Sequence, residues 1–258
     1  MFDLNNYSFL TIVLVGLAAI LLASEIGRWL GARTENRGSS NVSTLESAVL
    51  GLLALMLGFT FAMALSRFEA RRDAVLNEAN AIGTTALRAR LLPEPERKEV
   101  LKLLKEYVKV RLEITQRPVS RTELMTAIAQ SNALQESLWQ QAATSAAKNN
   151  GMVPTGLFIQ TLNDMIDNQG KRLAALHNRV PNIVLLALFG IAIVGSTFAG
   201  YANGMDPRRI RMPVYVMAVL VSGVIFLILD LDRLGGGFIA VSQQPMIDAA
   251  ASIDAFSN

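Results

Sequence analysis

Four long apolar runs, separated by polar stretches, dominate the pattern of residues along the chain. A helix needs about 20 mostly apolar residues to cross the roughly 30 Å of hydrocarbon in a bilayer, and each run is long enough. The pattern therefore predicts four transmembrane helices, at about residues 8–30, 45–66, 181–201 and 212–231.

Local signals mark the ends of these helices. Trp29 closes the first run at the depth where an indole ring prefers to lie. Residues 43–46 (Ser-Thr-Leu-Glu) have the spacing of a capping box and predict the start of the second helix. Pro181 opens the third run and Pro213 lies in the first turn of the fourth, where a missing amide hydrogen costs little.

The region between the second and third runs, residues 67–180, has the period of amphipathic helices and no useful strand alternation. No Gly or Pro separates the second run from the residues that follow, so its helix is expected to continue toward Leu92. Three further helices are expected: one after Pro93, one from Ser120 and one opening near Pro154. Their apolar faces carry Phe68, Val75, Ala79, Ile82, Ala86, Val100, Leu103, Leu104, Tyr107, Val110, Ile114, Leu124, Ile128, Leu134, Leu138, Phe158, Leu162, Met165, Ile166, Gln169, Leu173 and Leu176.

These patterns predict an all-α membrane protein with four transmembrane helices. A helical extramembrane domain lies between the second and third of them, and residues 1–258 form a single domain. Composition agrees, because 52% of the residues are hydrophobic and only 17% are charged, whereas soluble domains carry about 25% charged residues. An ordinary soluble enzyme is therefore excluded, and the cell (inner) membrane is the expected location.

The charge of the chain suggests lipid headgroups as partners. The net charge is +3 and the pI is near 9.4, but most Lys and Arg residues flank the membrane segments instead of forming a polar basic face. Nucleic acid is therefore not an expected partner. The absence of cysteine excludes disulfides and thiolate chemistry.

The side of the membrane on which residues 67–180 lie stays open. Four crossings place both termini and this region on one side. Nearly equal numbers of basic residues flank the two faces of the membrane, so the positive-inside rule does not decide which face is cytoplasmic. One end has Arg28, Arg33, Arg37, Arg208, Arg209 and Arg211, and the other has Arg67, Arg71, Arg72, Lys171, Arg172, Arg179 and Arg233.

The sequence offers little catalytic chemistry. His177 is the only histidine, and an interfacial polar role is favoured for it over catalysis or metal binding. The glycines at 235–237 lack the Lys-Ser/Thr ending of a phosphate-binding loop. We therefore expect no catalytic residue, no metal and no cofactor.

Carboxylates near the membrane edges are more informative, because an unpaired charge in hydrocarbon is costly. Glu25 either pairs with Arg28 on one helix face, the favoured interpretation, or belongs to an ion pathway. Asp230 and Asp232 either collect a hard cation such as calcium or form a polar cluster with Arg233. Two carboxylates are too few to define a cation site, so the cluster is favoured.

Two stripes run along the second membrane helix. The first consists of small residues at a spacing of four, which lets another helix approach closely: Ala54, Gly58, Ala62 and Ser66. The second is bulky and would form a hydrophobic neck that gates by dewetting if several copies surrounded an axis: Leu57, Phe61, Leu65 and Phe68. Contact with lipid or another helix is the simpler explanation of the bulky stripe.

Two longer motifs resemble a known family. The first comprises residues 69–72 (Glu-Ala-Arg-Arg), 77–84 (Asn-Glu-Ala-Asn-Ala-Ile-Gly-Thr), 87–88 (Leu-Arg) and 91–93 (Leu-Leu-Pro). The second comprises residues 230–233 (Asp-Leu-Asp-Arg), 237–242 (Gly-Phe-Ile-Ala-Val-Ser) and 243–246 (Gln-Gln-Pro-Met). Both are similar to motifs of the bacterial bestrophin-like membrane family, although Leu234 replaces the proline usual there. The resemblance covers essentially the whole chain.

The resemblance carries expectations about architecture and function. Bestrophins are pentameric ion channels, mostly permeable to anions, with four membrane helices, a cytoplasmic helical domain and a neck lined by the second membrane helix. Asp230 and Asp232 fall where bestrophins carry acidic residues linked to calcium, but the acidic run here is much shorter.

Two hypotheses of different classes follow. The leading one is a homo-oligomeric, pentameric channel that passes small ions, with anions suggested by the resemblance, through a pore lined by the second membrane helix. Its partners are the bilayer, other copies of the chain and the ions. The rival is a non-conducting membrane scaffold or sensor whose helical domain binds a partner. An enzyme is not expected, because the spans lack a nucleophile and base set.

Overall fold

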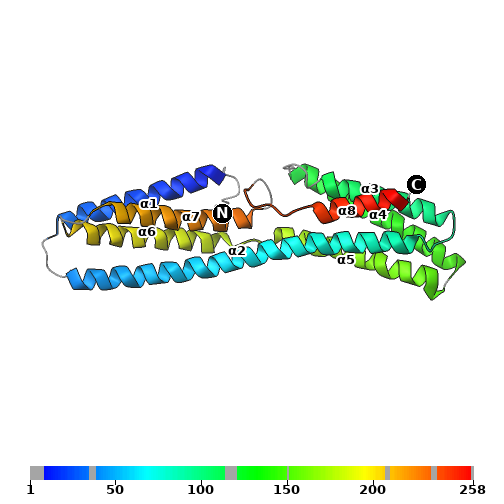
Figure 1. Ribbon diagram of the computed structural model, residues 1–258, viewed down its shortest axis with the longest axis horizontal. Helices are drawn as coiled ribbons and strands as arrows, with labels where there is room; N and C mark the ends of the chain where they lie inside the picture. Colours follow the sequence, from blue (N-terminus) through cyan, green and yellow to red (C-terminus); the bar gives the residue numbers. More distant parts are fainter. Residues whose placement is uncertain are drawn as a thin grey trace. The chain divides into compact units, whose positions relative to one another are not determined.

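The computed structural model describes residues 9–34, 39–113, 121–149, 151–206, 210–233 and 237–256. Every element in these ranges is a helix, which confirms the all-α class for the described part of the chain. A short irregular segment, η2 (Met152–Gly156), in which the backbone of Val153 is extended, precedes α5. The α-helices are α1 (Phe9–Ala32), α2 (Ser39–Ala89), α3 (Glu96–Glu113), α4 (Arg121–Lys148), α5 (Leu157–His177), α6 (Asn182–Gly204), α7 (Met212–Asp232) and α8 (Gln244–Phe256) (Figure 1).

Four helices are long and apolar enough to cross a membrane, namely α1, α2, α6 and α7. They match the four predicted spans, and the chain is an integral membrane protein. α6 begins directly after Pro181, and α7 has Pro213 in its first turn, as the sequence predicts. α2 also continues beyond its apolar half to Ala89, close to the predicted end at Leu92.

Two elements differ from the prediction. α2 begins at Ser39, so the capping-box residues 43–46 lie inside the helix. Residues 39–46 contain no Gly or Pro that would prevent the helix from extending to Ser39. The C-terminal helix α8 is not predicted by the apolar pattern at all. Several sequence predictions lie outside the described residues, namely those at Ser8, Arg37, Ile114, Ser120, Arg208, Arg209 and 234–236.

The chain divides into two compact units. The first joins Met1–Ser66 to Arg179–Arg233, and the second joins Arg67–Asn178 to Leu234–Asn258. α2 gives its first half to one unit and its second half to the other. The second unit therefore contains almost all of the predicted extramembrane region together with the C-terminal segment. That residues 1–258 behave as one domain, and that 67–180 lies outside the membrane, stay predictions.

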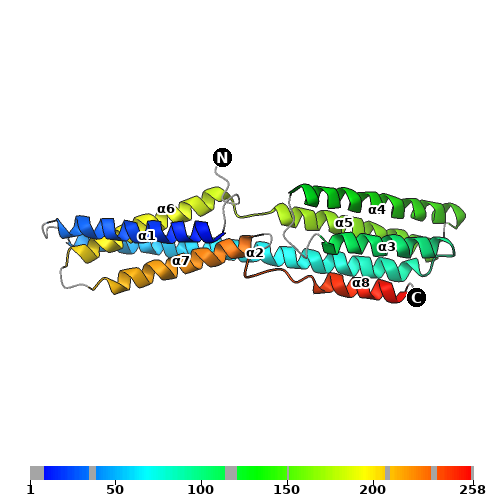
Figure 2. The same ribbon diagram turned by 90° about the horizontal axis from the view of Figure 1, so that it is seen from above.

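Glycine allows α1 and α6 to pack closely in the first unit, where α1, α6 and α7 contact one another (Figure 2). A Cβ added at Gly200 would lie 2.0 Å from the Ser24 carbonyl oxygen, and one at Gly27 would lie 2.1 Å from the Thr197 carbonyl oxygen. Gly31 and Gly204 meet the opposite helix in the same way, at 2.2 Å. Both helices thus use glycines four residues apart, the spacing that brings membrane helices together.

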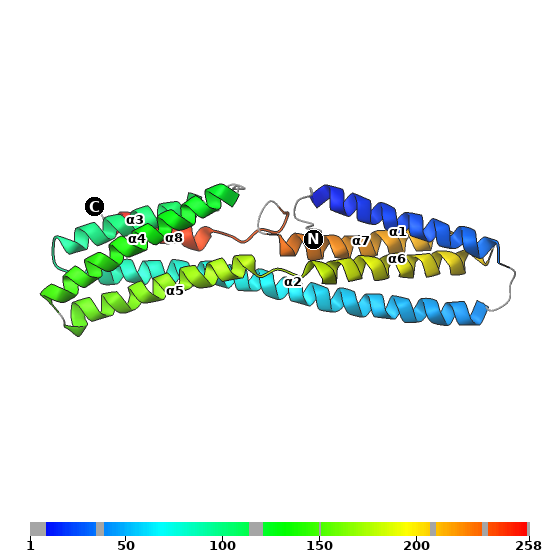
Figure 3. The same cartoon turned by 180° about the vertical axis from the view of Figure 1, so that it is seen from behind.

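The second unit is a helical bundle built around the second half of α2. α3 packs against α4 and α8, and α4 packs against α5 (Figure 3). Most of the residues predicted for the apolar faces of these helices lie in its core. Leu124, Ile128, Leu173 and Leu176 are only partly buried and lie outside it. Fully buried core side chains include Ile82, Leu104, Tyr107, Leu138, Phe158, Leu162, Met165, Met246 and Ile253.

Candidate functional site

The apolar half of α2 is only loosely held by its own unit. In residues 51–66, the buried side chains are Leu53, Thr60 and Ala64, which recur on one face of the helix. Most of the remaining surface is exposed and apolar, with Leu55 at 54% and Phe59 at 63% exposure. A membrane helix with so few contacts in its own chain must be covered by lipid or by another chain.

The predicted neck residues differ in their surroundings. Leu65 is exposed, at 36%, whereas Leu57, Phe61 and Phe68 are partly covered by their own chain. Phe59 lies on the opposite side of α2 from Phe61, because residues two apart are about 200° apart around a helix. The exposed apolar surface therefore includes a second flank, Leu52, Leu55 and Phe59, that the sequence analysis does not single out.

The small-residue stripe of α2 faces outward. Ala54, Gly58, Ala62 and Ser66 are all exposed, and a Cβ added at Gly58 would meet nothing within 4 Å. The close helix packing that small residues permit is used inside the chain by α1 and α6 instead. The role of the α2 stripe as a packing surface stays a prediction.

Asp230 and Asp232 end α7 as buried groups, 1% and 9% exposed. Asp232 accepts a hydrogen bond from the Val180 backbone N–H at 2.9 Å, and so secures the residues before α6. Asp230 is close enough to Arg233 for electrostatic attraction. No group of three or more metal-binding side chains occurs in the described ranges. The polar cluster stays a prediction.

Glu25 has a partner that the sequence does not suggest. The hydroxyl group of Tyr215 in α7 donates a hydrogen bond to the Glu25 carboxylate of α1. The ion pair expected between Glu25 and Arg28 is not among the contacts of the described residues. This hydrogen bond links α1 to α7.

The basic residues after the second span are not equivalent. Arg67 donates a hydrogen bond to the Asn178 side chain, and Arg71 is buried. Arg72 is exposed. Of these three residues, Arg72 is therefore the most open to solvent.

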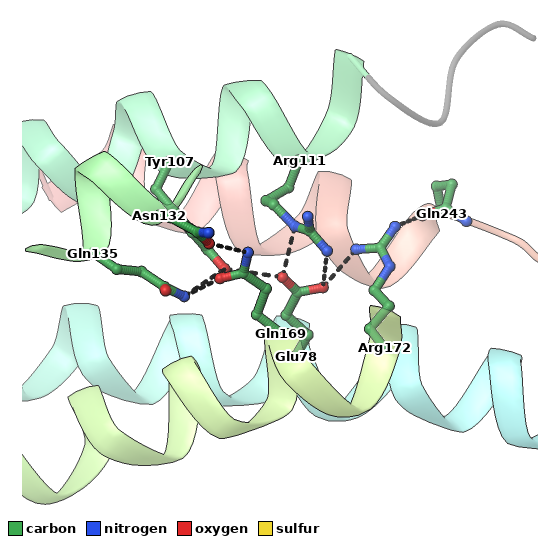
Figure 4. A network of polar contacts seen from close by, with 8 residues as sticks. All are labelled: Glu78, Tyr107, Arg111, Asn132, Gln135, Gln169, Arg172 and Gln243. Atoms are coloured by element: carbon green, nitrogen blue, oxygen red, sulfur yellow. Dashed lines mark hydrogen bonds and ion pairs between the residues drawn. The ribbon is translucent and has the colours of Figure 1, made fainter. Parts of the chain in front are cut away.

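A buried carboxylate organises the second unit. Glu78 of α2 is 0% exposed and lies between Arg111 of α3 and Arg172 of α5 (Figure 4). Arg111 donates to the two carboxylate oxygens at 2.7 and 3.2 Å. Arg172 donates at 2.6 Å, and the Tyr107 hydroxyl group donates at 3.1 Å. Three helices are thus joined through one carboxylate.

The network extends to α4 and to the C-terminal segment. Gln135 of α4 donates a hydrogen bond to the side-chain oxygen of Gln169. The side-chain NH2 group of Gln169 donates to the side-chain oxygen of Asn132 at 3.2 Å. Arg172 also donates to the Gln243 side-chain oxygen at 3.1 Å, just before α8 begins. The network therefore includes residues of α2, α3, α4 and α5, and the residue just before α8.

The electrostatics of the network keep its groups in fixed charge states. Burial alone raises the pKa of Glu78, but the attraction of Arg111 and Arg172 outweighs burial and holds that pKa below its ordinary value. Burial and then the nearby Glu78 charge raise the pKa of Tyr107 far above its usual range, so it stays a neutral donor. One carboxylate against two guanidinium groups leaves a net buried charge of +1.

The sequence contains a signal for this site that the apolar pattern alone overlooks. Glu78 falls on the face made by Val75, Ala79 and Ile82, so a charged residue occupies a predicted core position. Its partners Arg111 and Arg172 are far away in the sequence, and only the packing of α3 and α5 against α2 brings them to it.

Comparison with known proteins places the chain in a structural context. A family described as Bestrophin-like domain matches residues 11–246. Bacterial bestrophin homologues from Klebsiella pneumoniae have similar folds. A tyrosine-to-alanine variant is 14% identical, with a TM-score of 0.70 and coverage of 95% of this chain and 97% of that chain. The zinc-phased structure is 15% identical, with a TM-score of 0.69 and coverage of 97% and 98%. No curated protein matches the chain at a significant level.

Proposed function

The chain belongs to the Bestrophin-like domain family, and from this membership we propose that it is a homo-oligomeric channel for small ions in the cell (inner) membrane. The resemblance to bestrophins suggests a pentamer and anions as the permeant class. The pore is lined by the apolar half of α2. No covalent chemistry is involved.

The observation that carries this proposal is the exposure of α2. In a ring of copies, the pore-lining helix has one face toward the lumen and other faces toward neighbouring copies, so it must be largely exposed in a single chain. α2 meets this condition, because Leu53, Thr60 and Ala64 are its buried positions in residues 51–66. The stripe from Ala54 to Ser66 would let neighbouring copies approach closely.

The neck of the pore is proposed to lie on the bulky stripe of α2. A ring of Leu or Phe side chains forms a hydrophobic constriction that water leaves readily, which stops ion flow. Leu65 is the most exposed of the four predicted residues, and Phe61 lies one turn before it. Phe59 on the opposite flank supplies the alternative lining face.

Single-channel recording of protein reconstituted in bilayers tests the proposal. Phe61→Ala and Leu65→Ala should widen the constriction and raise the conductance or the open probability. Leu220→Ala is the matched control, because Leu220 is an exposed apolar residue of α7, at 65%, outside the proposed pore helix. It should leave conductance unchanged.

Two results would contradict parts of the proposal. An effect of Phe59→Ala, with none from Phe61→Ala or Leu65→Ala, would move the pore to the other flank of α2. Silent bilayers from the unmodified protein, together with a stoichiometric partner recovered from native membranes, would support the scaffold or sensor function instead.

A further inference from the structure

The bestrophin-like motif at residues 77–84 and 87–88 contributes side chains to two different sites in the second unit. Its inward side carries Glu78, which belongs to the buried network. Its outward side lines an open polar pocket between α2 and α5, to which α2 contributes Asn77, Asn80, Ala81, Thr84 and Arg88, and α5 contributes Thr161, Asp164, Asn168 and Lys171.

The α2 side of this pocket is unusual for an exposed helix surface. Asn77 and Asn80 lie in the interior of a long helix, where Asn is less favourable than Ala by about 0.7 kcal/mol. Both are exposed, and their side chains have no hydrogen-bond partner within the described ranges. Residues that disfavour the local structure without a compensating contact often mark functional positions.

Arg88 is held in place while part of its guanidinium group stays available. Its Nη1 atom donates to the Leu157 carbonyl oxygen at 2.9 Å and to the Gln160 side-chain oxygen at 3.3 Å. Among the described contacts, its Nε and Nη2 atoms have no acceptor. That edge of a guanidinium group matches the two oxygens of a planar oxyanion.

The charges around the pocket favour an anion. Arg88 and Lys171 face one carboxylate, Asp164, which leaves a net charge of +1 in the lining. Asp164 opposes a second negative charge on the ligand, so a monovalent anion fits best.

We infer that this pocket binds a small planar monovalent oxyanion of the carboxylate type. Arg88 pairs with the oxyanion, Lys171 contributes its ammonium charge, and the Asn77 and Asn80 amides donate hydrogen bonds. The inference rests on the proposed function in one respect: if the protein is a channel, this pocket is an ion-binding site that lies outside the apolar half of α2. Binding itself is independent of flux.

Binding of isotope-labelled formate to the purified full-length chain in nanodiscs tests the site, by NMR line broadening at constant ionic strength. Lys171→Gln should raise the Kd for formate by about threefold or more, because one cationic contact is lost. Asp164→Asn should lower the Kd, because a repulsive charge is removed. Lys109→Gln, a control at an exposed lysine of α3, should leave the Kd unchanged.

The opposite signs expected at Lys171 and Asp164 separate ligand binding from loss of structure, which would weaken binding in both variants. Absence of saturable formate binding, or an unchanged Kd in both variants, would overturn the inference. If the protein conducts ions but does not bind formate, the proposed site is wrong and the proposed channel function stands. Formate binding by a protein that does not conduct would refute the channel and keep the site.

Discussion

At the scale of single residues, Glu78 joins three helices of the second unit through one buried carboxylate. Its carboxylate neutralises part of the charge of two buried guanidinium groups and accepts a hydrogen bond from Tyr107. An ion pair of this kind adds little net stability compared with an apolar core, but removal of one partner leaves a buried charge without compensation.

Glu78→Gln should therefore lower the free energy of unfolding by about 3–5 kcal/mol. Thermal unfolding of the protein in nanodiscs measures the loss. Glu106→Gln is the control, because Glu106 is an exposed glutamate of α3. Equal melting temperatures for the two variants would show that the network does not stabilise the fold.

The lowered pKa of Glu78 also predicts a dependence of stability on pH. Because that pKa is lower in the folded than in the unfolded state, its contribution is complete above the ordinary value of 4.5 and is lost as the pH falls through the folded value. Melting temperature should thus decline below pH 4.5 in the unmodified protein. Glu78→Gln should show a weaker decline, since the titrating group is gone.

At the scale of elements, glycine controls how closely the helices of the first unit pack. Gly200→Ala should force α1 and α6 apart, because the new Cβ would lie 2.0 Å from a backbone oxygen. Such overpacking costs about 1–3 kcal/mol or more. Gly190→Ala is the matched substitution on the same helix, α6, where an added Cβ would meet nothing within 4 Å, and it should leave the melting temperature the same or higher. A melting temperature unchanged by Gly200→Ala would contradict the close packing.

α8 completes the core of the second unit. Met246 and Ile253 are fully buried, and Asp254 pairs with Lys105 of α3 at 2.7 Å. Ile253→Ala should cost about 2–5 kcal/mol, as expected for a large-to-small change in a core. Ile247→Ala, at a position of the same helix that is 45% exposed, should cost much less. Similar losses in the two variants would show that α8 does not dock as described.

Long elements of this fold are more readable from the sequence than short ones. Long apolar runs and regular helical periods predicted α1 to α7 well, because burial in a bilayer or a core selects those patterns directly. α8 was missed because it has only 13 residues, too few for a clear period. The glycines of α1 and α6 showed a readable spacing of four, but which helices they join depends on the tertiary fold.

The buried network could be predicted only in part. The position of Glu78 on an apolar face was visible in the sequence. Arg111 and Arg172 could not be picked out as its partners, because the sequence contains many other basic residues. Their convergence on one carboxylate is set by the packing of α3 and α5. The same applies to Asp232, whose contact with Val180 depends on the approach of α7 to the start of α6.

At the scale of the whole molecule, most of the apolar half of α2 is left uncovered by its own chain. A ring of copies would cover one flank by neighbours and direct another toward a central lumen. Homo-oligomers with closed rotational symmetry meet this requirement, because the same interface repeats until the ring closes.

The oligomeric state of the protein in nanodiscs is the measurement that tests this account most directly. Native mass and electron-microscopy class averages should show a five-fold ring with α2 on the inside. A monomer, or a dimer without a shared axis, would leave no place for the proposed pore and would contradict the account.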